Sequence, residues 1–295
     1  MRVFVTGATG FVGSAVVREL LNAGHHVLGL ARSDAGAKSL IEAGVEAHRG
    51  DLKDLQSLRG GAAKSDGVVH TAFIHDWSDF QASIDADQRA VEALIAELVD
   101  TGKPFINTSG MAFAAPGRIA TENDVPPISL PRIASEEAAA SAASHGVRGA
   151  VVRLPPSVHG AGDHGFVPGI IEIARETGVS AYVGGGENRW PSAHRLDAAR
   201  LYRLILESAS AAGRYHAVAD EGVPFRQIAE VIGRRLGLPV VSKPPEEAAA
   251  HFGFLGMFVG LDCPASSAKT QDALGWRPTQ PGLIADLDQP HYFAG

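Results

Sequence analysis

A glycine-rich run near the N-terminus carries the clearest chemistry in the chain. It reads Val-Phe-Val-Thr-Gly-Ala-Thr-Gly-Phe-Val-Gly over residues 3–13, with an apolar stretch before the glycines and an amphipathic one after them. Gly7 permits a tight turn, Gly10 lets the backbone approach a ligand, and Gly13 lets a helix pack close to the strand. The N-terminus of that helix offers N–H groups and a partial positive charge to an anion. The run predicts a dinucleotide pyrophosphate site made by Gly7, Thr9, Gly10, Phe11, Val12 and Gly13.

The end of the second predicted strand, His26–Leu30, indicates which dinucleotide binds. An acid at this place holds the ribose 2′-hydroxyl of NAD, whereas a basic residue accepts the 2′-phosphate of NADP. Arg32 stands nineteen positions after Gly13, and no acid precedes it in the strand. Arg32 and Ser33 together suit a phosphate, although Asp34 follows closely and weakens the preference. We expect NADP(H) to be preferred, with NAD(H) as the alternative.

Short apolar strands alternate with helices through the first half of the chain. The predicted strands are Arg2–Thr6, His26–Leu30, Val45–Arg49, Gly67–Thr71, Phe105–Thr108 and Gly149–Arg153. The predicted helices are Phe11–Asn22, Asp34–Ala43, Ser83–Val99 and Ser135–Ser144. This alternation predicts an α/β Rossmann fold, a doubly wound parallel sheet with helices on both faces. Ligands of such sheets bind beyond the carboxyl ends of the strands.

The pattern changes after residue 153. Residues 154–165 contain three glycines and two prolines, which is typical of a long functional loop. We expect a dinucleotide-binding domain of residues 1–153, to which residues 192–218 return. A smaller substrate-binding region of residues 154–191 and 219–295 would complete the chain.

Composition limits the partners of the chain. The net charge is −7 and no basic run occurs, which argues against nucleic acid and anionic membranes. No apolar run reaches the roughly 18 residues of a membrane span. Cys263 is the only cysteine, and the 12 histidines form no HExxH motif, so neither a disulfide nor a metal site is expected. A strand-like start at Arg2 leaves no room for a signal peptide, and we expect a cytoplasmic protein that acts on a small molecule.

These motifs resemble those of the extended short-chain dehydrogenase/reductase family, the NAD-dependent epimerase/dehydratase group. The shared stretches are TGATGFVG at 6–13, GDL at 50–52, HTA at 70–72, NTS at 107–109, RLPPSVHG at 153–160 and HRLDAA at 194–199. The resemblance implies further cofactor contacts from Asp51, Leu52, Thr71, Ala72, Phe73, Thr108, Pro155, Pro156 and Ser157. It also implies a homodimer formed by the helices predicted at 83–99 and 135–144.

The chain departs from the family in its catalytic residues. The family uses a Tyr-x-x-x-Lys pair with a Ser or Thr, and Ser109 matches the Ser. The Tyr should fall near residues 128–131, which read Ile-Ser-Leu-Pro, and none of the four tyrosines is followed four positions later by Lys. Arg132 lies near the place of the Lys, and His159 replaces a family Tyr in the loop after the sixth strand. The catalytic candidates are therefore Ser109, Arg132 and His159.

Three functions remain open from the sequence. The leading hypothesis is an NADP(H)-dependent oxidoreductase that reduces a small, fairly apolar carbonyl compound. Its substrate pocket would be lined by His75, Phe113, Phe166, Tyr182 and Trp190. The second is an NADP(H)-binding sensor without redox turnover, which the missing Tyr favours. The third is a nucleotide-sugar epimerase or dehydratase, for which Arg175, Arg189 and Arg195 would supply the basic substrate site.

Overall fold

The computed structural model describes residues 1–76, 79–115, 117–126 and 132–294. The chain divides into two compact units. The first unit contains the described residues of 1–109, 126–153 and 199–215, and the second those of 110–125, 154–198 and 216–294. Each unit is built from segments that are distant in the sequence.

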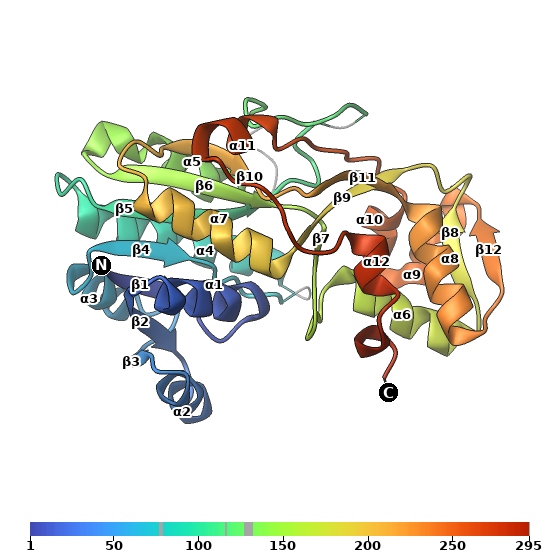
Figure 1. Cartoon of the computed structure of the whole chain (residues 1–295), viewed down its shortest axis with the longest axis horizontal. Helices are drawn as coiled ribbons and strands as arrows, with labels where there is room; N and C mark the ends of the chain where they lie inside the picture. The colour runs from blue at the N-terminus through green and yellow to red at the C-terminus, as the bar shows by residue number, and fades with distance from the viewer. Residues whose placement is uncertain (77–78, 116, 127–131, 295) are drawn as a thin grey trace. The chain divides into compact units, whose positions relative to one another are not determined.

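The first unit is built around a seven-stranded sheet in the described part of the chain (Figure 1). Its strands are β1 (Arg2–Thr6), β2 (His26–Ala31), β3 (Glu46–Arg49), β4 (Gly67–His70), β5 (Pro104–Gly110), β6 (Arg148–Leu154) and β10 (Gly213–His216). They lie in the order β10-β6-β5-β4-β1-β2-β3, and β1 pairs in parallel with both β2 and β4. The strand order therefore reverses beside β1, which is where open α/β sheets bind ligands. The predicted doubly wound fold is confirmed.

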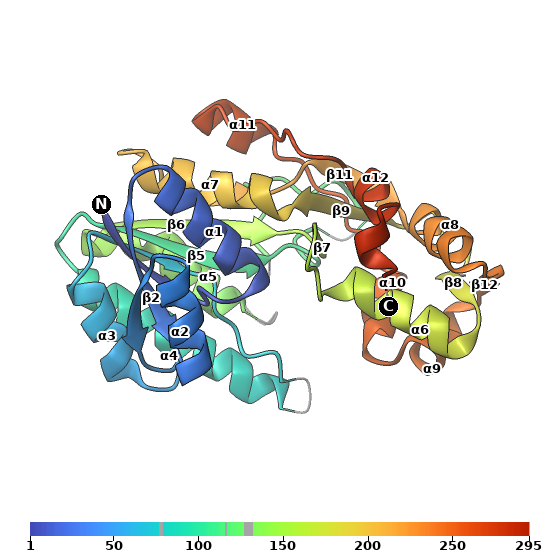
Figure 2. The same ribbon diagram turned by 60° about the horizontal axis from the view of Figure 1, so that its bottom comes forward.

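Helices cover both faces of this sheet. They are α1 (Phe11–Asn22), α2 (Asp34–Glu42), α3 (Leu55–Ala63), α4 (Phe80–Leu98), α5 (Ile133–Ser141) and α7 (Arg195–Glu207). Figures 1 and 2 show α1 and α7 on one face and α3, α4 and α5 on the other. Arg203 of α7 donates to Glu19 of α1 over 2.7 Å. On the opposite face Leu58, Leu94 and Ala139 pack against strand residues to form the core.

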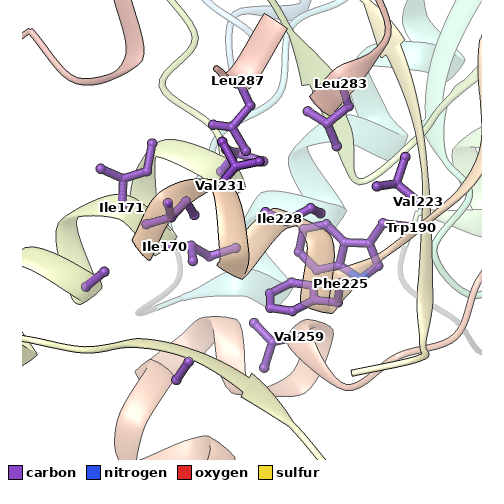
Figure 3. Close-up of a cluster of buried hydrophobic side chains, with 14 of the residues drawn as sticks. Ile170, Ile171, Trp190, Val223, Phe225, Ile228, Val231, Val259, Leu283 and Leu287 are labelled. Carbon is purple, nitrogen blue, oxygen red and sulfur yellow. The ribbon is translucent and has the colours of Figure 1, made fainter. Parts of the chain in front are cut away.

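The second unit contains two small sheets. One has the order β11-β9-β7, from Asp220–Pro224, Arg189–His194 and Ser157–His159, and the other pairs β8 (Ser180–Val183) with β12 (Val240–Lys243). Its helices include α6 (Phe166–Thr177), α8 (Phe225–Leu236), α9 (Ala248–Phe252), α10 (Gly256–Val259), α11 (Ala268–Leu274) and α12 (Leu283–Leu287). Figure 3 shows its core, in which Trp190 and Phe225 lie edge to face among aliphatic side chains from α6, α8 and α12.

Several elements were not predicted from the sequence. Helix α3 contains the pair Gly60-Gly61, which weakens a helical pattern, yet Gly61 is needed because a Cβ there would lie 2.4 Å from the Phe4 ring. Strand β9 contains Pro191, which argues against a strand in sequence reasoning. The sequence also predicts a short strand at Tyr215–Val218, and in the structure this strand, β10, spans Gly213–His216. No helix in the described residues is both long and apolar enough to cross a membrane.

Candidate functional site

The turn between β1 and α1 brings two backbone segments into direct contact. Gly7 has a φ of +68°, which favours glycine, and its carbonyl accepts from the Gly10 N–H over 2.9 Å. A Cβ on Gly13 would lie 2.0 Å from the Gly7 carbonyl oxygen and 2.8 Å from Oγ1 of Thr71. Both glycines are therefore fixed by packing inside the protein, whether or not a ligand is present.

Gly10 differs from its two neighbours in the motif. It is the N-cap of α1, no side chain caps the helix there, and the first turn holds no acid. A Cβ on Gly10 would meet only the Gly7 carbonyl oxygen, at 3.2 Å. The start of α1 is thus left without a Cβ and without a competing carboxylate, which is the arrangement that a diphosphate requires. The residues present fit a dinucleotide.

Four predicted cofactor residues follow β2 and β3. Arg32 is exposed, and in the described part of the chain its guanidinium makes no ion pair or hydrogen bond. The Ser33 hydroxyl accepts from the Gly36 N–H over 3.1 Å, so it caps α2. Oδ1 of Asp51 accepts from the Lys53 N–H over 2.9 Å, and Leu52 is buried beside it. Of these side chains, the Arg32 guanidinium is the one available for a ligand.

The segment after β4 carries four further candidates. The Thr71 hydroxyl donates to the Thr6 carbonyl over 2.7 Å, and the Ala72 N–H donates to the Thr6 hydroxyl over 3.4 Å. Phe73 is half-buried, and the ring of the exposed His75 lies 5.0 Å from its ring, edge to face. This segment is therefore tied to the end of β1 at its start and presents an aromatic pair further on.

A buried chain of polar groups lies behind this segment. His70, at the end of β4, is completely buried and hydrogen-bonds through Nδ1 to the Thr6 hydroxyl at 2.8 Å. Its Nε2 lies 3.3 Å from Oδ1 of Asp87, an α4 residue that is 1% exposed. The other carboxylate oxygen, Oδ2, lies 3.7 Å from Nε of Arg132. This series of polar contacts thus connects the end of β1 to Arg132, a candidate catalytic cation.

Arg132 is held from several directions. Its backbone is left-handed, with a φ of +67°, just before α5 begins. One guanidinium nitrogen donates to the Thr108 carbonyl over 2.8 Å, and the guanidinium carbon lies 4.1 Å from the Phe73 ring centroid. The structure therefore brings together three predicted residues, Phe73, Thr108 and Arg132, at the carboxyl ends of β4 and β5. A cation stacked on an aromatic face is a fixed electrostatic group.

Arg132 and its partners also determine the charge of Asp87. Burial would raise the pKa of the Asp87 carboxyl, because a charge is disfavoured away from water. The Arg132 guanidinium and the hydrogen bond from His70 outweigh burial and hold that pKa below its ordinary value. Asp87 is therefore ionised at neutral pH, and it forms a buried ion pair with Arg132.

The side chains of Ser109 and Thr108 point to opposite faces of β5. The Thr108 hydroxyl bonds to Tyr202 of α7, whereas Asn107 and Ser109 face α5, since alternate strand residues point to opposite faces. Ser109 is 2% exposed, and its hydroxyl makes no hydrogen bond of normal geometry within the described residues, although it helps to lower the pKa of the nearby Glu136 carboxyl.

The environment of Ser109 is a buried salt-bridge network. Glu136 is fully buried and paired with Arg153, which is also fully buried and approaches it through two guanidinium nitrogens. Arg214 adds a third cationic contact, with Nε 2.8 Å from the same carboxylate. Burial would raise the pKa of Glu136, but these arginines, Arg153 foremost, hold it low. Ser109 is thus placed beside a structural ion network rather than beside Arg132.

His159 belongs to the second unit. It is completely buried, its Nδ1 lies 2.8 Å from Oδ2 of Asp286, and its Nε2 has no hydrogen-bond partner in the described residues. Its ring lies 5.4 Å from that of His194. Burial lowers the pKa of His194, and His159 lowers it further. Among the other predicted residues of this stretch, Ser157 is also buried, and no residue that the structure describes forms a hydrogen bond with its hydroxyl.

The predicted pocket aromatics of the second unit fall into two groups. Phe113 and Phe166 are half-buried, and their ring centroids lie 6.0 Å and 4.8 Å from that of Phe258. Trp190 is completely buried, and its indole N–H donates to the Phe258 carbonyl over 3.2 Å. Tyr182 is also half-buried and packs against the same core, with the Arg226 guanidinium 5.5 Å from its ring. Phe258, in α10, was missed because its segment is glycine-rich and weakly periodic.

Asp87 was also missed, although the sequence contained a signal for it. It lies three positions after Ile84 and four before Val91, on the apolar stripe of the predicted helix. An acid at such a position is buried and needs a partner. His70 carried a weaker signal as a polar residue at the end of an apolar strand. Residues 128–131, where the family Tyr was sought, lie outside the described residues. The described residues contain no group of His, Cys, Asp or Glu that could hold a metal ion.

We predict that Asp87→Asn lowers the free energy of unfolding by about 3 kcal/mol or more at neutral pH, because it leaves Arg132 without its buried counter-ion. The native pKa of Asp87 lies below the unfolded value of 3.8, so its stabilisation is present above that value and is lost as the pH falls through the native pKa. Denaturant unfolding across the acid range should show a smaller acid-induced loss for the variant than for the wild type.

The matched control for this experiment is Asp85→Asn, an exposed position on the same helix. It should change the unfolding free energy by about 0.5 kcal/mol or less and leave the acid limb intact. Equal stability of the two variants would contradict the buried ion pair.

Comparison with known proteins identifies the family of the chain. The sequence model of the NAD dependent epimerase/dehydratase family matches residues 3–219. An uncharacterised protein of Schizosaccharomyces pombe is 50% identical over 99% of this chain and all of its own length. The 2-alkyl-3-oxoalkanoate reductase of Stenotrophomonas maltophilia is 29% identical over 82% of this chain and 78% of the reductase. The UDP-glucose 4-epimerase of Thermus thermophilus, solved with NAD, superposes with a TM-score of 0.77 at 22% identity over 99% of both chains. The chain belongs to the NAD dependent epimerase/dehydratase family.

Proposed function

We propose that this chain is an NADP(H)-dependent oxidoreductase that reduces a small, fairly apolar carbonyl compound to an alcohol. The observation that carries the proposal is the open N-terminus of α1 at the point where the strand order reverses, with the exposed Arg32 after the neighbouring strand. The diphosphate would lie at Gly10, and the 2′-phosphate would face Arg32. The name of the Stenotrophomonas maltophilia relative, a reductase of an oxo group, supports the same class of reaction.

The chemistry needs three contributions. When bound, NADPH supplies a hydride to the carbonyl carbon, and the oxygen then takes a proton to give the alcohol. Negative charge develops on that oxygen during the transfer, so a fixed positive group near it lowers the barrier. Arg132 meets this requirement, because its guanidinium is held by Thr108, Asp87 and the Phe73 ring. The cation would act by electrostatics alone, since an arginine does not release its proton.

The proton must come from another group. Among the histidines considered from the sequence, His75 is exposed and its ring contacts that of Phe73. The Arg132 guanidinium stacks on the same Phe73 ring. His159 is completely buried, and Asp286 holds one of its nitrogens. An exposed imidazole exchanges its proton with water and can pass it to a bound substrate. We therefore assign proton donation to His75 and give no part in the reaction to Ser109, which is buried beside Glu136, or to His159, which is buried in the second unit.

The apolar nature of the substrate is inferred from aromatic side chains. Phe113, Phe166 and Phe258 of the second unit are half-buried, so part of each ring is accessible. Half-exposed aromatic rings commonly line pockets for apolar ligands. A nucleotide-sugar substrate is less well supported, because Arg175 pairs with Glu172 and Arg189 with Asp262.

A second candidate function is an NADP(H) sensor without redox turnover. Two observations favour it. The Tyr-x-x-x-Lys pair is absent from the sequence, and the Ser109 hydroxyl is buried beside Glu136. Such a protein would bind the reduced cofactor as tightly as an enzyme does, so cofactor affinity alone does not separate the two functions.

We further propose a cytoplasmic homodimer formed through α4 and α5.

We predict that Gly10→Ala weakens cofactor binding with little effect on folding. The new Cβ would meet only the Gly7 oxygen, at 3.2 Å, but it would occupy the place at the start of α1 that the diphosphate needs. The dissociation constant for NADPH should rise at least about tenfold, while the unfolding free energy changes by about 1 kcal/mol or less. Gly60→Ala is the matched control, since its Cβ would have no neighbour closer than 3.9 Å. NADPH affinity unchanged in Gly10→Ala would contradict the assigned site.

We predict that the wild-type protein binds NADPH at least about tenfold more tightly than NADH and oxidises it in the presence of apolar aldehydes or ketones. Fluorescence titration measures the first property, and the absorbance of the reduced cofactor measures the second. Equal affinities would refute the NADP(H) assignment. Tight binding without turnover over a broad carbonyl panel would identify the sensor instead.

We predict that His75→Gln lowers kcat by about 100-fold or more, in the range lost with a general acid, and removes the near-neutral limb of the pH profile. Binding of NADPH should be unaffected. His145→Gln is the control, because His145 is an exposed histidine at the end of a short 3-10 segment in the same unit. A pH profile that keeps its shape in His75→Gln would show that water, not this histidine, delivers the proton.

A further inference from the structure

A second arginine lies at the edge of the sheet next to Arg32. Arg49 is the last residue of β3 and pairs in register with Ala31 of β2. Its side chain reaches over the end of β2, where one guanidinium nitrogen lies 3.4 Å from the Arg32 carbonyl oxygen. The same nitrogen lies 3.0 Å from Oδ1 of Asp34. Arg49 therefore contacts both ends of the turn that connects β2 to α2.

In the ion pair between Arg49 and Asp34, the guanidinium can exchange the carboxylate for a phosphate. The Asp34 side chain is fully exposed and that of Arg49 is half-exposed. Exposed pairs contribute little to stability, because water and salt compete for both partners. A phosphate with nearly two negative charges attracts a guanidinium more strongly than a single carboxylate does, and it accepts two parallel hydrogen bonds. Asp34 would lose little on release, since it is already solvated.

Asp34 is also the residue that most opposes NADP(H) at this site. A carboxylate near the end of β2 repels a 2′-phosphate, and it can accept a hydrogen bond from the 2′-hydroxyl of NAD. The pair with Arg49 neutralises Asp34 and occupies one of its oxygens. Arg49 thus stands where it can weaken the contact that would favour NAD(H) and strengthen the contact that would favour NADP(H).

We propose that Arg49 is a specificity-determining residue. It breaks its ion pair with Asp34 and binds the 2′-phosphate of the cofactor together with Arg32. This inference rests on the proposed NADP(H) function and adds to it a residue and an exchange of ion pairs. In the absence of a 2′-phosphate, Arg49 holds Asp34. When the phosphate is present, two guanidinium groups from adjacent strand ends flank it, and Asp34 turns to solvent.

The test measures dissociation constants for NADPH and NADH by fluorescence titration, with 2′,5′-ADP and 5′-AMP as competing probes that lack the nicotinamide. Arg49→Gln should lower the NADPH-to-NADH preference at least about fivefold, because one charge-assisted contact to the phosphate is lost. The same loss should appear in the ratio for 2′,5′-ADP and 5′-AMP. Asp34→Asn should raise the preference, because it removes the repelling carboxylate and frees Arg49.

Lys64→Gln is the matched control. It also removes one exposed positive charge from the first unit, but Lys64 follows α3 and precedes the central strand β4, whereas Arg49 ends the edge strand β3. A preference that changes less than about fivefold in Arg49→Gln overturns the inference, and so does a Lys64→Gln effect of equal size. If the wild type prefers NADPH while Arg49→Gln keeps that preference, this inference alone fails. If the wild type shows no preference, the proposed cofactor assignment fails with it.

Discussion

The contact between Gly13 and the Gly7 carbonyl is the constraint on which the rest of the first unit depends. A Cβ at Gly13 would lie 2.0 Å from that oxygen, so no other residue fits without moving α1 away from β1. Because α1 is pressed against the strand, its N-terminus opens directly beyond the carboxyl end of β1. Because β1 lies where the strand order reverses, the space there is not closed by a crossover connection on both sides. Packing and ligand access thus follow from the same missing side chain.

The buried polar chain depends on the same turn from the opposite direction. Thr6 is the last residue of β1, and its hydroxyl bonds to His70, which in turn contacts Asp87. Asp87 faces Arg132, so the guanidinium is positioned by groups that lead back to the end of β1. Removing a buried partner from such a chain leaves an unsatisfied charge, which costs more than the pair itself contributes. The cation at the carboxyl ends of β4 and β5 is therefore fixed by the fold, and it does not need a substrate to order it.

The sequence was sufficient for the fold and for the residues at strand ends, and insufficient for the direction of side chains. Strand and helix periodicity predicted the doubly wound sheet, and the glycine spacing predicted the α1 turn. Ser109 illustrates what was out of reach. Its place at the end of β5 was correctly expected. Whether its side chain faces α5 or α7 depends on which helix covers each face of the sheet, and no local sequence pattern gives that. Asp87 could have been found from its place on an apolar stripe, but its partner Arg132 lies 45 residues later in the chain, and no local pattern connects them.

The first unit contains a buried and an exposed ion pair, and their environments give them different properties. The pair of Asp87 and Arg132 is shielded from water, so salt screens it little and its geometry is rigid. The pair of Arg49 and Asp34 is exposed, so it is weak, sensitive to salt and free to change partners. Rigid charge suits the stabilisation of a developing oxyanion, because no reorganisation is needed when the charge appears. Exchangeable charge suits the choice between two cofactors that differ by one phosphate. We therefore expect a mutation at the edge of the sheet to alter cofactor preference while the buried polar groups that position Arg132 stay unchanged.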